Sequence, residues 1–442
     1  MALHEIETAV RSDIEKLQLD RIKKTVNTVY EKVDFYKEKF DEKGIKPEDI
    51  ASLEDIKKLP FTRKQDMRDH YPFGLFAVGR DEIVRVHCSS GTSGKPTVVG
   101  YTQNDIDNWA EIVARAITIA GGNPGEILHN AYGYGLFTGG LGLHYGGEKL
   151  GMATVPVSGG NTQRQITLIE DFEPTVICAT PSYALNIAET MEQMGKDPRQ
   201  TSLKYGIFGA ESWSEEMRKT LEEKLGIKAC DIYGLSEVIG PGVSMECHEA
   251  QDGLHVTDDH FYVEVIDPET LEPVPDGTQG ELVFTSLTKE AFPIIRYRTG
   301  DIASITKEKC SCGRTTTRMS RVKGRIDDML IIRGVNVFPS EIEHYLISIE
   351  ELDPHYQLHL KKKGSMDIVE LHCEISEAFH KSINGDMASE AVQLLQYKIQ
   401  HQLKSNCYVA INTVIKEPKQ VPRSEGKAIR IVDHRKQVLE EV

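Results

Sequence analysis

A short segment rich in serine, threonine and glycine has the residue types that hold phosphate groups. It consists of Ser89, Ser90, Gly91, Thr92, Ser93, Gly94 and Lys95, and Pro96 follows it. Glycine lets backbone amides approach an anion closely, hydroxyl groups donate hydrogen bonds, and lysine adds a positive charge. A Walker A loop needs a glycine five residues before its Gly-Lys pair and a Ser or Thr after it, and Ser89 and Pro96 occupy those positions. Taken alone, the segment is either a phosphate-binding loop or a flexible linker.

Four further motifs occur along the chain after this loop. They are Tyr233-Gly-Leu-Ser-Glu237, Arg298-Thr-Gly-Asp301, Gly324-Arg-Ile-Asp-Asp328 and Pro422-Arg-Ser-Glu-Gly-Lys427. The five motifs resemble, in the same order, those of the adenylate-forming superfamily, which includes acyl-CoA ligases, luciferases and carrier-protein adenylation domains. Longer strings, such as Thr285-Ser-Leu-Thr-Lys-Glu-Ala291, are similar to the phenylacetate-CoA ligase family. The resemblance extends over nearly the whole chain.

This resemblance implies an ATP- and AMP-binding site with Mg²⁺. Tyr233 offers a ring for adenine stacking, Asp301 and Arg325 can hold the ribose hydroxyls, and Glu237 is an oxygen ligand for Mg²⁺. A surface turn would explain Asp301 equally well outside the family context. The remaining nucleotide-binding positions, besides the loop Ser89–Lys95, are Gly209, Ala210, Glu211, Asp231 and Gly234.

Lys427, with Glu237, is the predicted catalytic residue. In the family, the lysine pairs with the substrate carboxylate and the α-phosphate as negative charge builds in the transition state. The resemblance further implies a hinge at Asp327, about which a C-terminal domain rotates between two poses. CoA is expected to enter along Arg333 and Gly334.

An aromatic and glycine-rich stretch, Asn130-Ala-Tyr-Gly-Tyr-Gly-Leu-Phe-Thr-Gly-Gly140, is the candidate acyl pocket. Tyr132, Tyr134 and Phe137 can wall a flat slot, and Gly135 leaves it open, because glycine has no side chain to block an aromatic ring. A packed bend between a helix and a strand is the alternative.

Two short cysteine-containing segments predict a structural zinc site. Cys310-Ser-Cys312-Gly313 is a thiolate pair followed by a turn residue, and Cys247 and His255 lie in an upstream loop. Together they can form a Cys₃His tetrahedron. His248 could take the place of His255 as the imidazole ligand. The alternative interpretation is that the cysteines are reduced and bind no metal.

Length and periodicity predict two or three domains of α/β class. Apolar residues from Ile6 to Val33 recur at helical spacing, and later segments such as Thr175–Ala179 read as short strands. We expect a multi-layer N-terminal adenylation domain with mostly parallel sheets at residues 1–325. A small α+β C-terminal domain is expected at residues 326–442, with a helix opened by a capping box of Ser340 and Glu343.

Charge and hydropathy limit the partners. The net charge of −16 opposes binding to nucleic acid and anionic membranes, and no apolar run suggests a membrane span or signal peptide. We therefore expect a cytoplasmic protein, and the family resemblance implies a homodimer that takes ATP, CoA and an aromatic carboxylic acid. An enzyme that loads a carrier-protein pantetheine and an idle nucleotide-binding homologue are the alternatives.

Overall fold

The computed structural model describes residues 4–89, 96–326, 329–332, 335–363, 366–406, 411–424 and 426–435. Its contacts divide the chain into two compact units. Unit 1 comprises Met1–Ala179, Arg199–Ala210 and Gly226–Val322, and unit 2 comprises Thr180–Pro198, Glu211–Leu225 and Lys323–Val442. The C-terminal part of unit 2 thus begins three residues before the predicted boundary, and two earlier segments belong to the same unit.

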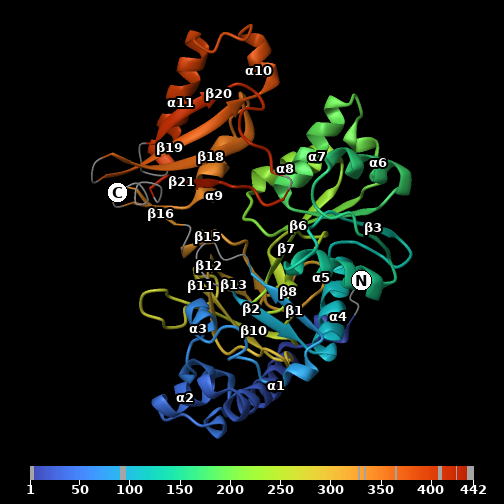
Figure 1. Ribbon diagram of the computed structural model, residues 1–442, viewed down its shortest axis with the longest axis vertical. Helices are drawn as coiled ribbons and strands as arrows, with labels where there is room; N and C mark the ends of the chain where they lie inside the picture. Colours follow the sequence, from blue (N-terminus) through green and yellow to red (C-terminus); the bar gives the residue numbers. More distant parts are fainter. Residues whose placement is uncertain are drawn as a thin grey trace. The chain divides into compact units, whose positions relative to one another are not determined.

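The largest sheet of unit 1 has nine strands in the order β13-β14-β9-β8-β7-β6-β5-β3-β4 (Figure 1). Its strands are β3 (Ile127–Asn130), β4 (Ala153–Val155), β5 (Val176–Ala179), β6 (Tyr205–Gly209), β7 (Lys228–Leu235), β8 (Gly240–Glu246), β9 (Leu254–Val256), β13 (Ile305–Thr306) and β14 (Arg318–Met319). Pairing is parallel from β4 to β7 and antiparallel from β7 to β13. The α/β class is confirmed, and the parallel pairing occupies one half of this sheet.

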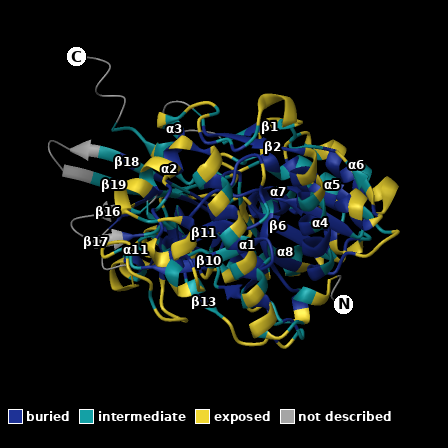
Figure 2. Ribbon diagram, turned by 90° about the horizontal axis from the view of Figure 1, so that it is seen from below, coloured by how far each residue is buried: buried dark blue, intermediate teal, exposed yellow. Residues whose placement is uncertain are grey.

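Antiparallel strands make up the rest of the β-structure of unit 1. They are β1 (Arg85–Cys88) with β2 (Val98–Tyr101), and β10 (Phe261–Ile266), β11 (Gly280–Ser286) and β12 (Tyr297–Ala303) in that order. Every residue of β11 is buried, as expected for a strand covered on both faces. Figure 2 shows such buried strands in dark blue and the outward turns of the helices in yellow.

The helices of unit 1 include α4, which begins at a side-chain cap. They are α1 (Arg11–Lys32), α2 (Asp34–Lys43), α3 (Lys64–Asp69), α4 (Gln103–Ile119), α5 (Thr138–Leu150) and α6 (Thr162–Phe172), with 3₁₀ turns at Glu5–Thr8, Pro47–Asp49, Leu53–Lys58 and Arg80–Glu82. The Thr102 hydroxyl caps α4 by accepting a hydrogen bond from the Asp105 amide, and the Asp105 carboxylate accepts one from the Thr102 amide. The long N-terminal helix predicted from periodicity is α1.

Helices α4 and α5 pack closely because α5 carries glycines on the contact face. A Cβ atom on Gly146 would lie 2.3 Å from Val113 Cγ1, and one on Gly142 would lie 2.6 Å from Trp109 Cζ2. Any side chain at these positions would push the helices apart. The glycine-rich sequence after the candidate acyl stretch therefore serves packing.

Unit 2 contains a four-stranded sheet in the order β20-β19-β18-β21, drawn in orange to red in Figure 1. Its strands and its other elements are β15 (Gly324–Arg325), β16 (Leu330–Ile332), β17 (Val335–Val337), β18 (Leu352–Lys363), β19 (Met366–Ile375), β20 (Asn412–Lys416), β21 (Ile431–Asp433), α7 (Pro181–Gln193), α8 (Glu215–Leu225), α9 (Pro339–Ile347), α10 (Glu377–Ser382) and α11 (Glu390–Asn406). A 3₁₀ turn at Pro198–Gln200 lies at the edge of unit 2. The buried side of α11 comprises Val392, Leu395, Ile399 and Leu403, as its spacing predicted. The described residues include no helix long and apolar enough to cross a membrane.

The start of α9 corrects one prediction. Its N-cap is Phe338, whose amide donates to Glu341 Oε2 over 3.2 Å, and Pro339 takes the first helical position. Proline is favoured there because its missing N–H would have no partner in the helix. The capping box of Ser340 and Glu343 is therefore wrong. The Ser340 hydroxyl binds the Lys323 carbonyl, and Glu343 is buried.

Candidate functional site

The loop predicted to bind phosphate joins the antiparallel strands β1 and β2. Ser89 is its only described residue: its amide donates to the Thr97 carbonyl over 2.9 Å. The Ser89 hydroxyl is buried, and it has no hydrogen-bond partner among the described residues. The predicted positions Ser90, Gly91, Thr92, Ser93, Gly94 and Lys95 lie outside the described residues.

Two positions that were predicted to bind nucleotide, from separate motifs, meet in unit 1. The Tyr233 hydroxyl on β7 donates to Asp301 Oδ2 on β12 over 2.6 Å. One face of the Tyr233 ring stacks on Phe284, with ring centroids 6.0 Å apart. Asp301 is only 5% exposed and lies within a strand, so it is not a surface-turn residue. An aromatic face and a carboxylate are thus fixed together, as adenosine recognition requires.

A pair of charged residues that the sequence did not single out surrounds Asp231. Glu246 Oε2 accepts a hydrogen bond from the Asp231 amide over 3.0 Å. Arg321 Nη2 lies 3.7 Å from Glu246, and Arg321 Nε lies 3.9 Å from the Asp231 carboxylate. Glu246 is 1% exposed, so its charge is paired inside the unit. These contacts hold the strand that carries Tyr233.

Glu237, the predicted Mg²⁺ ligand, is buried next to a cation. Lys64 Nζ, from α3, lies 3.7 Å from Glu237 Oε1. The neighbouring Ser236 hydroxyl is 3.1 Å from the Thr138 hydroxyl at the start of α5. Mg²⁺ in nucleotide sites usually takes one or two carboxylates together with phosphate oxygens, and a single carboxylate at this position fits that pattern.

The predicted small residues lie at the ends of β6 and β7. Gly209 ends β6, and Ala210 follows it with a left-handed φ of 67°. Gly234 lies at a register shift between β7 and β8, where a Cβ atom would be 2.0 Å from the Gly240 carbonyl oxygen. Only glycine fits at position 234, because β7 and β8 approach each other too closely there for a side chain. This explains the glycine in the motif Tyr233-Gly-Leu-Ser-Glu237.

In the candidate acyl stretch, the Tyr134 hydroxyl has polar partners and the Phe137 side chain is exposed. Asn130 Nδ2 donates to the Tyr134 hydroxyl over 2.8 Å, and His144 Nδ1 lies 3.2 Å from the same oxygen. Burial raises the pKa of Tyr134 to about 12. Tyr132 is 7% exposed, Gly135 has a φ of 135°, and Phe137 is 50% exposed at the N-cap of α5. The phenol of Tyr134 is therefore a polar group that two hydrogen-bond partners hold in place.

Three predicted site residues belong to unit 2. Arg325 forms β15, and Lys427 is an exposed residue between β20 and β21. Glu211 precedes α8, and its carboxylate accepts hydrogen bonds from the amides of Ser182 and Ala428. The hinge position Asp327 and the CoA-entry positions Arg333 and Gly334 lie outside the described residues.

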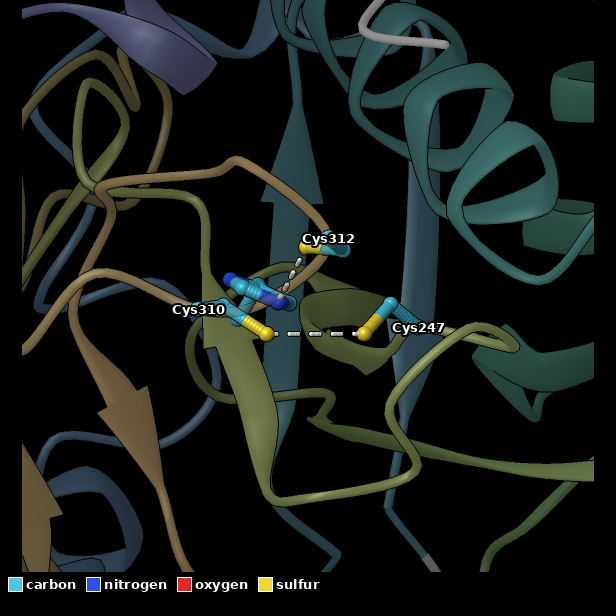
Figure 3. A group of neighbouring side chains, drawn as sticks. Cys247, Cys310 and Cys312 are labelled. Atoms are coloured by element: carbon cyan, nitrogen blue, oxygen red, sulfur yellow. Dashed lines mark hydrogen bonds between the residues drawn. The ribbon is translucent and has the colours of Figure 1, made fainter.

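The four predicted zinc ligands converge in unit 1. The Cys247, Cys310 and Cys312 thiols and a His255 ring nitrogen all lie within 4.8 Å of one another. Figure 3 shows the three labelled sulfur atoms turned toward one another, with Cys247 and Cys310 3.9 Å apart. His255 Nε2 is 3.4 Å from Cys312 Sγ, and its other ring nitrogen is 3.1 Å from the Thr316 hydroxyl. The rival His248 lies against the Ile119 carbonyl instead.

The surroundings of this cluster favour a thiolate at Cys312. A hydrogen bond from the Cys247 thiol holds the pKa of Cys312 well below its usual range. Arg314 Nη1 lies 3.7 Å from Cys312 Sγ, while Arg314 Nε binds Glu7 over 2.8 Å. The Thr315 amide donates to the Glu7 carbonyl over 2.9 Å. The loop that contains Cys310 and Cys312, called the cysteine loop below, therefore contacts Glu7 near the N-terminus as well as His255 on β9.

Comparison with known proteins assigns this fold and site to the adenylate-forming enzymes. A model of the AMP-binding enzyme family matches residues 5–288, and a model of the AMP-binding enzyme C-terminal domain matches residues 334–435. The chain therefore belongs to the AMP-binding enzyme family, which confirms the resemblance inferred from its motifs.

Curated relatives match almost the entire chain. A phenylacetate-coenzyme A ligase from Thermus thermophilus is 53% identical over 98% of this chain and 99% of its own. One from Escherichia coli is 50% identical over 98% of both chains. Among solved structures, 2-hydroxyisobutyryl-CoA ligase in the postadenylation state with 2-HIB-AMP has a TM-score of 0.91 at 29% identity, over 98% of this chain and 93% of that one. The same enzyme in the thioesterification state, with 2-HIB-AMP and CoA, has a TM-score of 0.71 over 99% and 94%.

Proposed function

We propose that the protein is an AMP-forming ligase that joins an arylacetic acid, phenylacetate or a close aromatic analogue, to CoA. The observation that carries this proposal is the sequence identity of 50–53% between this chain and two phenylacetate-coenzyme A ligases, over 98% of the chain. The contact between Tyr233 and Asp301 supports it, because two residues expected to hold one adenosine are fixed side by side.

In the first half-reaction, the carboxylate attacks the α-phosphate of ATP, and pyrophosphate leaves. A carboxylate is a poor electrophile, and the resulting acyl-adenylate gives it a good leaving group. Lys427 pairs with the substrate carboxylate and the α-phosphate while charge builds in the transition state. Tyr233, Asp301 and Arg325 bind the adenosine, and Glu237 would hold a Mg²⁺ ion that screens the phosphates.

In the second half-reaction, the CoA thiol attacks the acyl carbonyl, and AMP leaves. We propose that the C-terminal domain turns about Asp327 between the two steps and that CoA approaches along Arg333 and Gly334. The aromatic ring of the acid lies against Tyr132, Gly135 and Phe137, while Tyr134 presents its hydroxyl to the slot.

We also propose a structural zinc ion at Cys247, His255, Cys310 and Cys312. Three thiols and one imidazole match the Cys₃His set of tetrahedral zinc sites, and the four side chains lie close enough to share one ion. The site is remote in sequence from Lys427, and its role is to tie two loops together. A homodimer in the cytoplasm is proposed from the family resemblance alone.

The deciding experiment measures two products with a panel of aromatic and aliphatic acids. We expect acid-dependent release of pyrophosphate from ATP and, on adding free CoA, a thioester, with phenylacetate or a close analogue giving the highest kcat/KM. Pyrophosphate release without thioester formation on free CoA would instead favour a carrier-protein enzyme. No pyrophosphate release with any acid would favour an idle nucleotide-binding homologue.

A further inference from the structure

The segment that carries Lys427, described over residues 421–424 and 426–430, is anchored at both ends inside unit 2. At its start, the Val421 amide donates to Glu374 Oε2 over 2.8 Å, and Arg423 Nη2 donates to Glu374 Oε1 over 2.5 Å. At its end, Arg430 Nη2 lies 3.1 Å from Glu343 Oε2. Glu374 and Glu343 are 0% and 2% exposed, so the carboxylate of each anchoring ion pair is buried. We call this segment the lysine loop.

Hydrogen bonds also hold the two peptide groups that flank Lys427. One is made with Thr180, the N-cap of α7, and the other with Glu211. The Gly426 carbonyl accepts a hydrogen bond from the Thr180 hydroxyl over 2.8 Å. The Ala428 amide donates to Glu211 Oε2 over 2.7 Å. With the peptide planes before and after it fixed, the backbone of Lys427 has little freedom, and its side chain starts from a defined position.

Glu211 makes this connection with both of its carboxylate oxygens. While Oε2 accepts from Ala428, Oε1 accepts from the Ser182 amide over 2.9 Å. Ser182 lies in the first turn of α7, where backbone amides point outward and a negative charge is favoured. Hydrogen bonds to an ionised carboxylate are about twice as strong as neutral ones. One side chain therefore joins the lysine loop to the N-terminus of α7.

We propose that Glu211 is a positioning residue, a latch that sets the lysine loop for adenylate formation. The inference rests on the proposed role of Lys427 in the first half-reaction. It changes the interpretation of Glu211, which the motif pattern had grouped with the nucleotide-binding residues. A residue that binds nucleotide would act through the affinity for ATP, whereas the latch acts through the rate of adenylation alone.

The test compares Glu211→Ala with wild type in two assays. Acid-dependent exchange of pyrophosphate into ATP reports the first half-reaction, and thioester formation from a supplied acyl-adenylate reports the second. We expect kcat for exchange to fall about 10- to 100-fold, as expected for a catalytic group displaced by about 1 Å. The KM for ATP and the thioester rate stay within about twofold of wild type.

Two further variants make the result specific. Glu211→Gln keeps one acceptor oxygen, so it recovers part of the exchange rate and serves in place of Glu211→Ala if the alanine variant has a lowered melting temperature. In a Lys427→Ala background, Glu211→Ala causes no additional loss, because the loop then positions no lysine. Glu223→Ala, an exposed glutamate on α8, is the matched control and leaves both assays unchanged.

Three results would overturn the latch. They are an unchanged exchange rate in Glu211→Ala, a raised KM for ATP with unchanged kcat, and an equal loss in both half-reactions. If the proposed role of Lys427 in adenylate formation is wrong, the result is different, because Lys427→Ala then keeps its pyrophosphate exchange activity. If Lys427→Ala abolishes exchange and Glu211→Ala does not, the latch alone is wrong.

Discussion

The Tyr233 hydroxyl and the Asp301 carboxylate are 2.6 Å apart, although 68 positions separate them in the chain. The hydrogen bond joins the nine-stranded sheet, through β7, to the strand β12 of the neighbouring antiparallel sheet. Because Asp301 is almost fully buried, the phenol restricts where its second oxygen can point. The proposed nucleotide site thus depends on a contact between two sheets.

Tyr233→Phe tests this contact by removing only the hydroxyl. The ring stays on Phe284, but Asp301 loses the donor that orients it, so the KM for ATP should rise about tenfold, equivalent to about 1.4 kcal/mol. Steady-state kinetics with varied ATP measures this. Tyr397→Phe, at an exposed position of α11, is the control, and an unchanged KM for ATP in Tyr233→Phe would refute the orienting role.

Lys427→Ala separates the two half-reactions. Loss of a positive charge that acts on the transition state of adenylation should lower pyrophosphate exchange by about 100-fold or more. Conversion of a supplied acyl-adenylate to the thioester should remain within about twofold. The exposed Lys381→Ala on α10 controls for loss of charge in the same unit. An equal loss of both activities would show that the assigned role is wrong.

The zinc proposal predicts about one zinc ion per chain in purified protein. His255→Ala and Cys310→Ser should each lose the ion and lower the melting temperature, because the metal ties the cysteine loop to β9. His248→Ala, which removes the rival imidazole, should retain zinc. Elemental analysis and thermal unfolding provide the readouts. Wild-type protein without metal, or loss of zinc in His248→Ala alone, would contradict the proposed ligand set.

Lys289 predicts a pH-dependent stability. Its Nζ is buried 3.2 Å from the centre of the Tyr101 ring, and burial lowers the pKa of Lys289 to about 7. The unfolded state, in which the pKa of lysine is about 10.4, binds more protons between these values, so the destabilisation present below pH 7 is relieved as pH rises.

Urea unfolding of wild type and Lys289→Met at pH 7 and pH 9 measures this effect. Relative to the variant, wild type should gain about 2 kcal/mol between the two pH values. Parallel behaviour of the two proteins would show that Lys289 keeps its proton in the fold.

Motif order identified candidate site residues but not their neighbours. Tyr233, Asp301, Glu237 and Lys427 were singled out because their motifs have a recognisable spacing. Lys64, Glu246 and Arg321 carried no local signal, because each meets its partner only through the tertiary fold. The α/β class followed from the alternation of strands and helices, but the change from parallel to antiparallel pairing at β7 depends on long-range register.

Local rules failed where tertiary contacts competed with them. The spacing of Ser340 and Glu343 predicted a capping box, but in the structure Glu343 forms an ion pair with Arg430 at the end of the lysine loop. Glu211 was predicted to bind nucleotide, and the structure shows that its carboxylate accepts hydrogen bonds from two backbone amides. Glu343 and Glu211 both contact the segment that carries Lys427.

The central claim is that the acid is activated as an acyl-adenylate, and oxygen transfer tests it directly. Turnover of phenylacetate labelled with ¹⁸O in its carboxyl group, in the presence of ATP and CoA, should place one labelled oxygen in the phosphate of each AMP formed, as mass spectrometry would show. Unlabelled AMP, or label in inorganic phosphate formed together with ADP, would contradict the mechanism.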